Sequence, residues 1–255
     1  MNNPAPRKRT DSAIALTGFG LAVLTAVTVM LAGFGSRWGW WHFRIGFMML
    51  QWGFYIGLAA AAVSLVGTVA VRSGGSRRAF VSAIAGLVIA LVIVSDLWQW
   101  KQTAIRVPPI HDITTDTENP PDFVAILPLR ADAPNPAAYG GPEIAAQQRA
   151  GYPKLGPSVL PIPPAQAFER ALAAARDMGW EIVASNPSEG RIEATDTTFW
   201  FGFKDDIVVR IRPTEGGSRI DVRSVSRVGR SDVGTNAKRI QKFLRNVDKK
   251  PPPKN

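Results

Sequence analysis

The chain has 255 residues, 46% of them hydrophobic, and carries 30 lysines and arginines against 20 aspartates and glutamates, a formal net charge of +10. It contains no cysteine, which excludes disulfides, thiolate catalysis and thiolate-bound zinc or iron–sulfur centres. The charges are unevenly distributed, since Asp11 and Asp96 are the only acidic residues among the first hundred. Such a split predicts an N-terminal part solvated by lipid and a C-terminal part solvated by water.

Three long apolar stretches predict a transmembrane anchor with helices at residues 13–34, 47–71 and 79–100. Each is about as long as the ~20 residues that cross a bilayer core. The first is longer than the core of a cleaved signal peptide, so we interpret it as a retained span. The second carries a small-residue stripe, which favours close packing against the other two spans over homodimerisation. This stripe consists of Gly53, Gly57, Ala61 and Ser64.

The short segments that flank the spans predict the orientation. The tail at residues 1–12 and the second loop hold six basic residues, Arg7, Lys8, Arg9, Arg72, Arg77 and Arg78, against Arg37 and Arg44 in the first loop. Basic flanks stay in the cytoplasm. We therefore expect a multi-pass protein of the bacterial inner membrane with a cytoplasmic N-terminus and a periplasmic C-terminal domain. An outer aromatic belt is expected from Trp38, Trp40, Trp41, Trp98 and Trp100.

The segment at residues 101–163 is rich in proline. Thirteen of the chain's 20 prolines lie between Val107 and Pro164, and proline is excluded from helix interiors and central strands. The segment also contains large apolar residues that a solvated linker would lack, including Phe123, Ile126, Leu127, Leu129, Tyr139, Ile144, Tyr152 and Leu155. We expect an extended segment wrapped on the following domain, with a short helix at about residues 142–149.

Residues 164–247 predict a soluble α+β domain. Helical periodicity and strand alternation give a four-stranded antiparallel sheet with two helices, in the order α-β-β-β-β-α. The elements are a helix at 164–178, strands at 180–185, 191–197, about 207–211 and 219–225, and a final helix lined by Ala237, Ile240, Phe243, Leu244 and Val247. Residues 248–255 predict a disordered tail.

Short motifs occur in a characteristic order along the C-terminal half. They are His111-Asp112-Ile113-Thr114-Thr115-Asp116 before Pro120-Pro121, Tyr139-Gly140, Gly190-Arg191-Ile192-Glu193-Ala194, Phe201-Gly202-Phe203 before Asp205-Asp206, and Ser224-Val225-Ser226-Arg227 before Gly229. Together they resemble the family of domains of unknown function numbered 1499, over about residues 110–247. The three preceding spans look like an architecture of that family in proteobacteria. The family has no established activity, so the resemblance implies no catalytic residues.

His111, Asp112 and Asp116 are a candidate metal or acid–base group, since imidazole and carboxylates are ligands of divalent metals. The alternative is a turn in which these side chains satisfy loop backbone groups. We favour the turn, because the only other histidine, His42, lies beside the membrane. No cofactor is predicted.

Residues 199–203 contain four aromatic side chains between two predicted strands. Alternation predicts that Phe199, Phe201 and Phe203 are buried under the helices while Trp200 points outward. The alternative is a hydrophobic-contact site in which Trp200, Phe201 and Phe203 line a lipid pocket or meet the membrane surface.

Four arginines, Arg210, Arg212, Arg223 and Arg227, are candidates for anion binding. A two-residue turn at Gly216-Gly217 would place Arg212 opposite Asp221 and Arg210 opposite Arg223, on the solvent side of the sheet. Directly opposed like charges are destabilising, which indicates a missing anion. A solvated, solubility-giving face is the alternative.

The leading functional hypothesis is a membrane-anchored, non-enzymatic binding or scaffold protein of the bacterial cell envelope. Its partners would be the lipid bilayer and an anionic lipid or acidic envelope polymer. The alternative is an envelope hydrolase or metal-dependent enzyme centred on His111, Asp112 and Asp116. Nucleic acid is not expected as a partner because the basic residues would lie outside the cytoplasm. The sequence leaves the ligand and the oligomeric state open.

Overall fold

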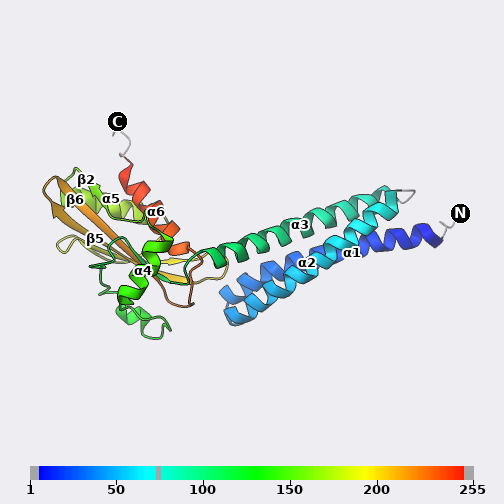
Figure 1. The fold of residues 1–255 in the computed structure, drawn as a ribbon, viewed down its shortest axis with the longest axis horizontal. Helices are drawn as coiled ribbons and strands as arrows, with labels where there is room; N and C mark the ends of the chain where they lie inside the picture. The colour runs from blue at the N-terminus through cyan, green and yellow to red at the C-terminus, as the bar shows by residue number, and fades with distance from the viewer. Residues whose placement is uncertain (1–5, 73–75, 250–255) are drawn as a thin grey trace. The chain divides into compact units, whose positions relative to one another are not determined.

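The computed structural model describes residues 6–72 and 76–249, shown in Figure 1. These residues form two compact units. The helical unit comprises the chain as far as Gln102 together with Phe199–Gly202, and the sheet unit comprises the rest. Residues 1–5 of the predicted cytoplasmic tail and residues 250–255 of the predicted disordered tail lie outside the described residues.

The helical unit is built from α1 (Pro6–Arg37), α2 (Phe43–Arg72) and α3 (Arg77–Arg106). By length and composition all three could cross a membrane, which marks the chain as a membrane protein. Large apolar side chains point outward, as lipid would solvate them; Leu16, Trp52 and Val69 are 55%, 61% and 66% exposed. Each helix continues beyond the predicted apolar span, because the flanking polar residues extend the same helical hydrogen-bond pattern.

Small residues allow the three helices to approach closely. A Cβ atom added at Gly18 of α1, or at Gly86 of α3, would lie 2.6 or 2.7 Å from Ser64 Oγ of α2. Likewise a Cβ at Gly53 would lie 2.8 Å from Val29, and one at Gly57 would lie 2.9 Å from Val94. The small-residue stripe of α2 therefore packs within the unit.

Replacing Gly18 or Gly86 by leucine is expected to destabilise the helical unit. The added side chain would overlap with α2 or with the backbone of Phe19, so the helices must separate, at a cost of about 1–3 kcal/mol or more. Thermal aggregation of the full-length protein in detergent would measure the loss. Gly20→Leu is the matched control, since a Cβ at Gly20 meets nothing within 4 Å. Equal destabilisation by this control would show that the helix crossing is not responsible.

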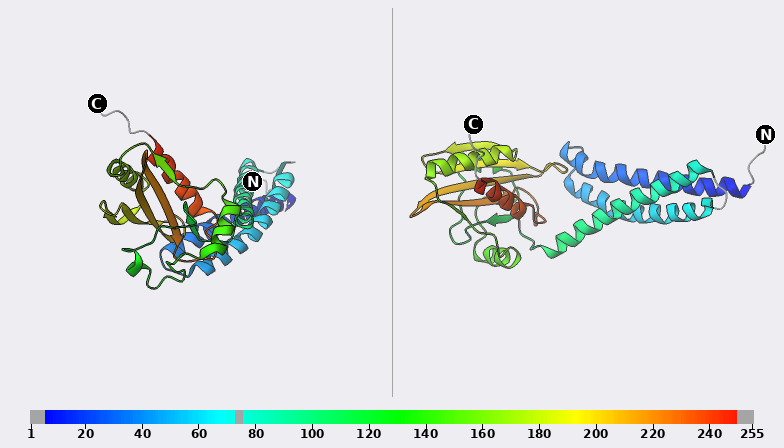
Figure 2. Two further views of the ribbon diagram at one scale, coloured as in Figure 1. Left: turned by 60° about the vertical axis from the view of Figure 1, so that its left-hand side comes forward. Right: turned by 90° about the horizontal axis from the view of Figure 1, so that it is seen from above.

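The sheet has six antiparallel strands, in the order β1-β6-β5-β4-β3, with β2 paired to β6. Figure 2 shows the ribbon from two further sides, with the strands drawn as arrows. They are β1 (Asp112–Thr114), β2 (Ser158–Leu160), β3 (Glu181–Asn186), β4 (Arg191–Thr197), β5 (Lys204–Thr214) and β6 (Gly217–Ser226). The prediction of four strands was wrong. β1 and β2 have three residues each and lie in the proline-rich segment, so they are too short to show an alternating pattern.

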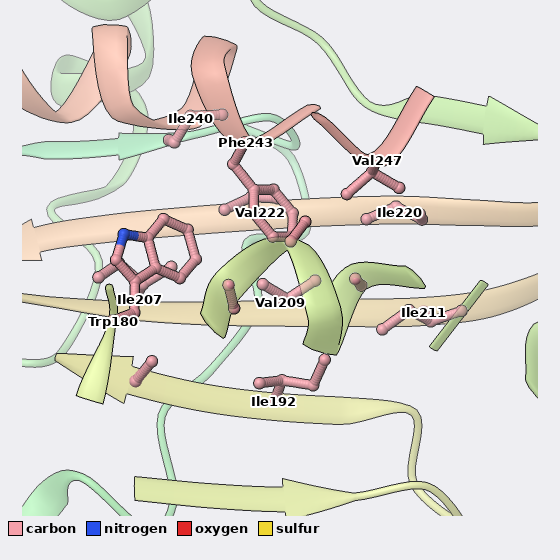
Figure 3. Packing of buried hydrophobic residues seen from close by; sticks show 14 of the residues in the cluster. Trp180, Ile192, Ile207, Val209, Ile211, Ile220, Val222, Ile240, Phe243 and Val247 are labelled. Carbon is pink, nitrogen blue, oxygen red and sulfur yellow. The ribbon is translucent and has the colours of Figure 1, made fainter. Parts of the chain in front are cut away.

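One face of the sheet is covered by α5 (Pro164–Asp177) and α6 (Thr235–Asp248). Their apolar faces meet the alternate strand residues that point toward them, and Figure 3 shows Phe243 close to Val222. Proline lies in the first turn of α5, and the Asp232 carboxylate accepts hydrogen bonds from the amides of Gly234 and Asn236 before and at the start of α6. The main hydrophobic core lies between these helices and the sheet.

The opposite face is covered by the proline-rich segment, which contains η1 (Leu127–Arg130) and α4 (Gly141–Gly151). Phe123 and Ile126 form a second apolar cluster with Val208 and Val225 of the sheet. The Gln148 side chain of α4 exchanges two hydrogen bonds with the backbone of Thr114 in β1. This face was predicted to be exposed to solvent, and that prediction was wrong because a segment distant in sequence packs on it.

The β5–β6 hairpin turns at Glu215-Gly216, with Thr214 paired to Gly217. The predicted register was therefore wrong by two residues. Glycine is favoured at position 217 by its φ of +150° and by a close neighbour, since a Cβ there would lie 2.0 Å from the carbonyl oxygen of Leu160 in β2. A shift of two residues keeps every side chain on its predicted face but changes its partner across the strands.

Candidate anion-binding site

Three arginines gather on the sheet face opposite α5 and α6. Arg210 and Arg212 are two residues apart in β5, and Arg219 and Asp221 are two residues apart in β6. Since side chains two residues apart in a strand point to the same side, all four lie on one face. Arg210 lies opposite Asp221, and Arg212 lies opposite Arg219. Asp116, from the loop after β1, completes the cluster.

Asp221 is the buried centre of this cluster, with a fully buried side chain. Its carboxylate accepts hydrogen bonds from Arg212 Nη2 at 2.9 Å, from Arg210 Nη2 at 3.2 Å and from Arg219 Nη2 and Nε at 3.0 Å. The hydrogen bond to Asp221 is the main cause that raises the pKa of Arg219, and nearby Asp116 adds to it. Arg219 is therefore held as a cation, and the same carboxylate fixes the positions of Arg210 and Arg212.

The cluster retains capacity for a further anion. Three guanidinium groups face two carboxylates, and the side chains of Arg212 and Arg219 are 38% and 33% exposed. In the described residues, the hydrogen bonds of Arg212 all use Nη2. Its Nε and Nη1 groups therefore face solvent or a ligand.

Arg223 and Arg227, which the sequence grouped with Arg210 and Arg212, lie in separate ion pairs. Arg223 is fully buried and bonds both oxygens of Asp112, at 2.9 and 2.8 Å, beneath the rings of Phe123 and Tyr139. Arg227 bonds both oxygens of Asp206 at 2.8 and 2.9 Å. The predicted repulsion between Arg210 and Arg223 is absent, because their strands pair in a different register.

Asp206 connects two cations, Arg227 and Arg130, on this same face. Burial raises the pKa of its carboxyl, but hydrogen bonds from Arg227, Thr195 and Arg130 outweigh burial and hold the pKa below its ordinary value. Because the pKa of Asp206 is lower in the folded protein than in the unfolded chain, its ionised carboxylate stabilises the fold at pH values above the unfolded-state pKa. This stabilisation is lost as the pH falls through the folded-state pKa. Asp206 thus acts as a structural anion and not as a proton carrier at neutral pH.

The three residues considered as candidate metal ligands each have different partners. Asp112 is paired with Arg223, and His111 Nδ1 lies 3.4 Å from the carbonyl oxygen of Arg230. Asp116 Oδ1 accepts hydrogen bonds from the amides of Glu118 and Asn119, which is the predicted turn. Among residues 6–72 and 76–249, no three histidine, aspartate or glutamate side chains are grouped to hold a metal ion.

The aromatic residues Phe199–Gly202 belong to the helical unit. Trp200 Nε1 donates a hydrogen bond to the carbonyl oxygen of Met30 at 3.2 Å, and the Phe201 ring lies 5.1 Å from that of Phe47. Phe199 is 78% exposed, so its predicted burial under the sheet helices was wrong. The Phe203 amide donates a hydrogen bond to Thr198 Oγ1, and the Thr198 amide donates one to the carbonyl oxygen of Phe203, both at 2.8 Å. Alternation failed because the strand ends at Thr197 and a turn follows.

Arg219 is the site residue that the sequence reasoning missed. The sequence shows that Arg219 lies two residues before Asp221 and so on the same face of the strand. The wrong register, however, placed Arg212 opposite Asp221 and not opposite Arg219. The predicted contact between Arg212 and Asp221 is present at 2.9 Å, as a diagonal neighbour pair.

A family model described as "Protein of unknown function (DUF1499)" matches residues 112–247, which include all five members of the cluster. No curated protein matches the chain. No solved structure matches it either.

Proposed function

This chain belongs to the DUF1499 family of proteins of unknown function, and from that premise we propose that it is a membrane-anchored, non-enzymatic binding protein of the bacterial cell envelope. The observation that carries the proposal is the incomplete neutralisation of Arg210, Arg212 and Arg219 at a partly exposed surface. The partner is an anionic lipid headgroup or an acidic envelope polymer.

The arginine chemistry supports an oxyanion as the ligand. Guanidinium groups donate in a planar fork that matches carboxylate and phosphate oxygens. Arg212 and Arg219 face each other directly across two strands, a pairing that costs free energy unless anions bridge it. Two carboxylates bridge it in part, and a further anion would complete the neutralisation.

The basic residues that flank the spans support a periplasmic sheet unit. Arg72, Arg77 and Arg78 lie at the described ends of α2 and α3, whereas Arg37 and Arg44 lie at the connection between α1 and α2. With Arg7, Lys8 and Arg9 on the same side as the first group, the basic excess marks the cytoplasmic side. The N-terminus is then cytoplasmic, and the protein lies in the inner membrane.

A reporter enzyme active only in the periplasm is expected to be active when fused after Val247 and inactive when inserted at Gly74-Gly75, a pair outside the described residues. The physical reason is the excess of basic residues beside the second site. Reporter activity in cells is the measurement, with immunoblots as the control for equal expression. The reverse pattern would contradict the proposed localisation.

Full-length protein in zwitterionic nanodiscs is expected to bind vesicles that contain an anionic lipid, and added salt should weaken the binding. Arg212→Gln/Arg219→Gln should weaken it at least ten-fold, since each cation near an anionic surface contributes about 1 kcal/mol. Co-flotation with the vesicles would measure it.

The matched control is Lys238→Gln/Lys242→Gln, which removes the same charge from exposed positions of α6. This variant should bind as the unaltered protein does. If both variants lose binding equally, overall charge and not the arginine cluster is responsible, and the proposed site is wrong.

A further inference from the structure

The two carboxylates of the arginine cluster differ in origin and burial. Asp221 belongs to β6, and its side chain is fully buried, whereas Asp116 comes from a loop and is 12% exposed. A single oxygen, Asp116 Oδ2, lies 3.3 Å from Arg210, 3.5 Å from Arg212 and 3.0 Å from Arg219. One carboxylate is thus built into the sheet, and the other is delivered to the same three guanidinium groups from outside it.

We propose that Asp116 occupies the position of the ligand, and that the cluster binds a phosphate group that displaces this carboxylate. The inference rests on the proposed function and names the ligand class of the same site. Asp221 remains in place and holds the arginines while the exchange occurs.

The charge of the cluster favours phosphate over carboxylate. Three guanidinium groups and Asp221 carry a net charge of +2 when Asp116 leaves, and a phosphate dianion neutralises it. A carboxylate ligand would leave a surplus positive charge, as Asp116 does. The exchange therefore stabilises the opposed pair of Arg212 and Arg219 better than the internal carboxylate can.

The hydrogen-bond geometry leads to the same ligand. Asp116 presents only Oδ2 to the arginines, because Oδ1 accepts from the amides of Glu118 and Asn119 at 3.2 and 2.9 Å. Three donors therefore converge on one oxygen. A phosphate group presents at least three oxygens, so each guanidinium group could bond its own oxygen.

The attachment of Asp116 permits the exchange. Its contacts apart from the arginines are local, namely the two amides of its own turn and a backbone contact of 3.3 Å with Thr114 Oγ1. Withdrawal of the carboxylate together with this turn breaks no strand pair, since β1 ends at Thr114. It gives up the hydrogen bonds from Arg210 to the carbonyl oxygen of Asn119 and from Arg149 to the hydroxyl of Thr117.

Asp116→Asn in the full-length protein tests the proposal, because asparagine keeps an oxygen for the turn but removes the competing charge. In zwitterionic nanodiscs, titration calorimetry with inorganic phosphate and glycerol 3-phosphate should show at least ten-fold tighter binding than in the unaltered protein. Phosphate should also raise the unfolding temperature of the variant more than that of the unaltered protein. Asp132→Asn, an exposed aspartate of the same segment, is the control and should change neither value.

Asp116→Asn/Arg219→Gln should lose the gain in phosphate affinity. The source of the phosphate follows from a parallel arm with vesicles containing phosphatidic acid. If only the soluble phosphates bind more tightly, the ligand is a free phosphate. If only the vesicles bind more tightly, the ligand is a lipid headgroup. Either result supports the proposal. The unfolding temperature without ligand shows whether a variant is folded. If Asp116→Asn does not fold, Asp116→Glu takes its place. This variant keeps the charge, so it should bind phosphate no more tightly than the unaltered protein.

Unchanged or weaker binding by folded Asp116→Asn would overturn the role of Asp116. The proposed function would survive that result if the unaltered protein still bound anionic vesicles through Arg212 and Arg219. Loss of vesicle binding by the unaltered protein would instead reject the proposed function itself.

Discussion

Residues 107–250 are expected to fold without the membrane helices, whereas residues 161–250 are expected to remain unfolded. The shorter fragment retains α5, α6 and the four longer strands. It loses β1 and β2, and it exposes the second apolar cluster around Val208 and Val225.

The lost segment also supplies partners for buried charges. Glu193 is fully buried, and its carboxylate accepts hydrogen bonds of 3.0–3.1 Å from the amides of Val124, Ala125 and Ile126. Arg130 and Asp112 neutralise Asp206 and Arg223 on the same face. Without the segment these groups lose their partners and become exposed to water together with the apolar cluster, so the shorter fragment loses both the paired charges and the apolar burial that stabilise this face.

Urea titration followed by tryptophan fluorescence distinguishes the two fragments, since Trp180 is buried and stacked on Phe243 in the main core. Residues 107–250 should show a cooperative transition and residues 161–250 none. A cooperative transition of similar midpoint in the shorter fragment would show that the proline-rich segment is only a linker.

Asp112→Ala is expected to destabilise residues 107–250 by about 3–5 kcal/mol, because it leaves the Arg223 guanidinium buried and unpaired. The remaining acceptors of Arg223 are the carbonyl oxygens of Pro121 and Ala137, which are neutral. Removal of one partner of a buried pair costs far more than removal of an exposed charge.

The change in urea midpoint at constant slope would measure this loss. Asp122→Ala, an exposed aspartate in the same segment, serves as the control and should change the free energy of unfolding by less than about 0.5 kcal/mol. The double variant Asp112→Leu/Arg223→Met should recover part of the loss, because two apolar side chains leave no buried charge. A single variant as stable as the control would mean that water reaches Arg223.

The elements that depend on local patterns could be predicted from the sequence. Continuous apolar runs predicted three helices able to cross a membrane, and they are present. Alternation located the four longer strands, since each is long enough to repeat a period of two. The family resemblance on short motifs was confirmed by the match over residues 112–247.

The second face of the sheet could not be predicted in this way. Charged residues at alternate positions, such as Glu193 and Arg223, are typical of a solvated strand face. Both are fully buried here, and the partner of Arg223, Asp112, lies 111 residues away in the sequence. Alternation assigns a residue to a face but does not identify what covers that face. The arginine cluster depends on the same long-range pairing through Asp116.

The Gln148 side chain protects one edge of the sheet from pairing with another copy of the protein in the membrane. An unpaired strand edge is a template on which another copy can add a strand. The Gln148 amide pairs with both backbone groups of Thr114 and so acts as a short additional strand beside β1. At the other end of the sheet, the irregular pairing of β3 between Ile182 and Ala184 disturbs the second template. Both features disfavour the edge-to-edge joining of sheets from neighbouring copies.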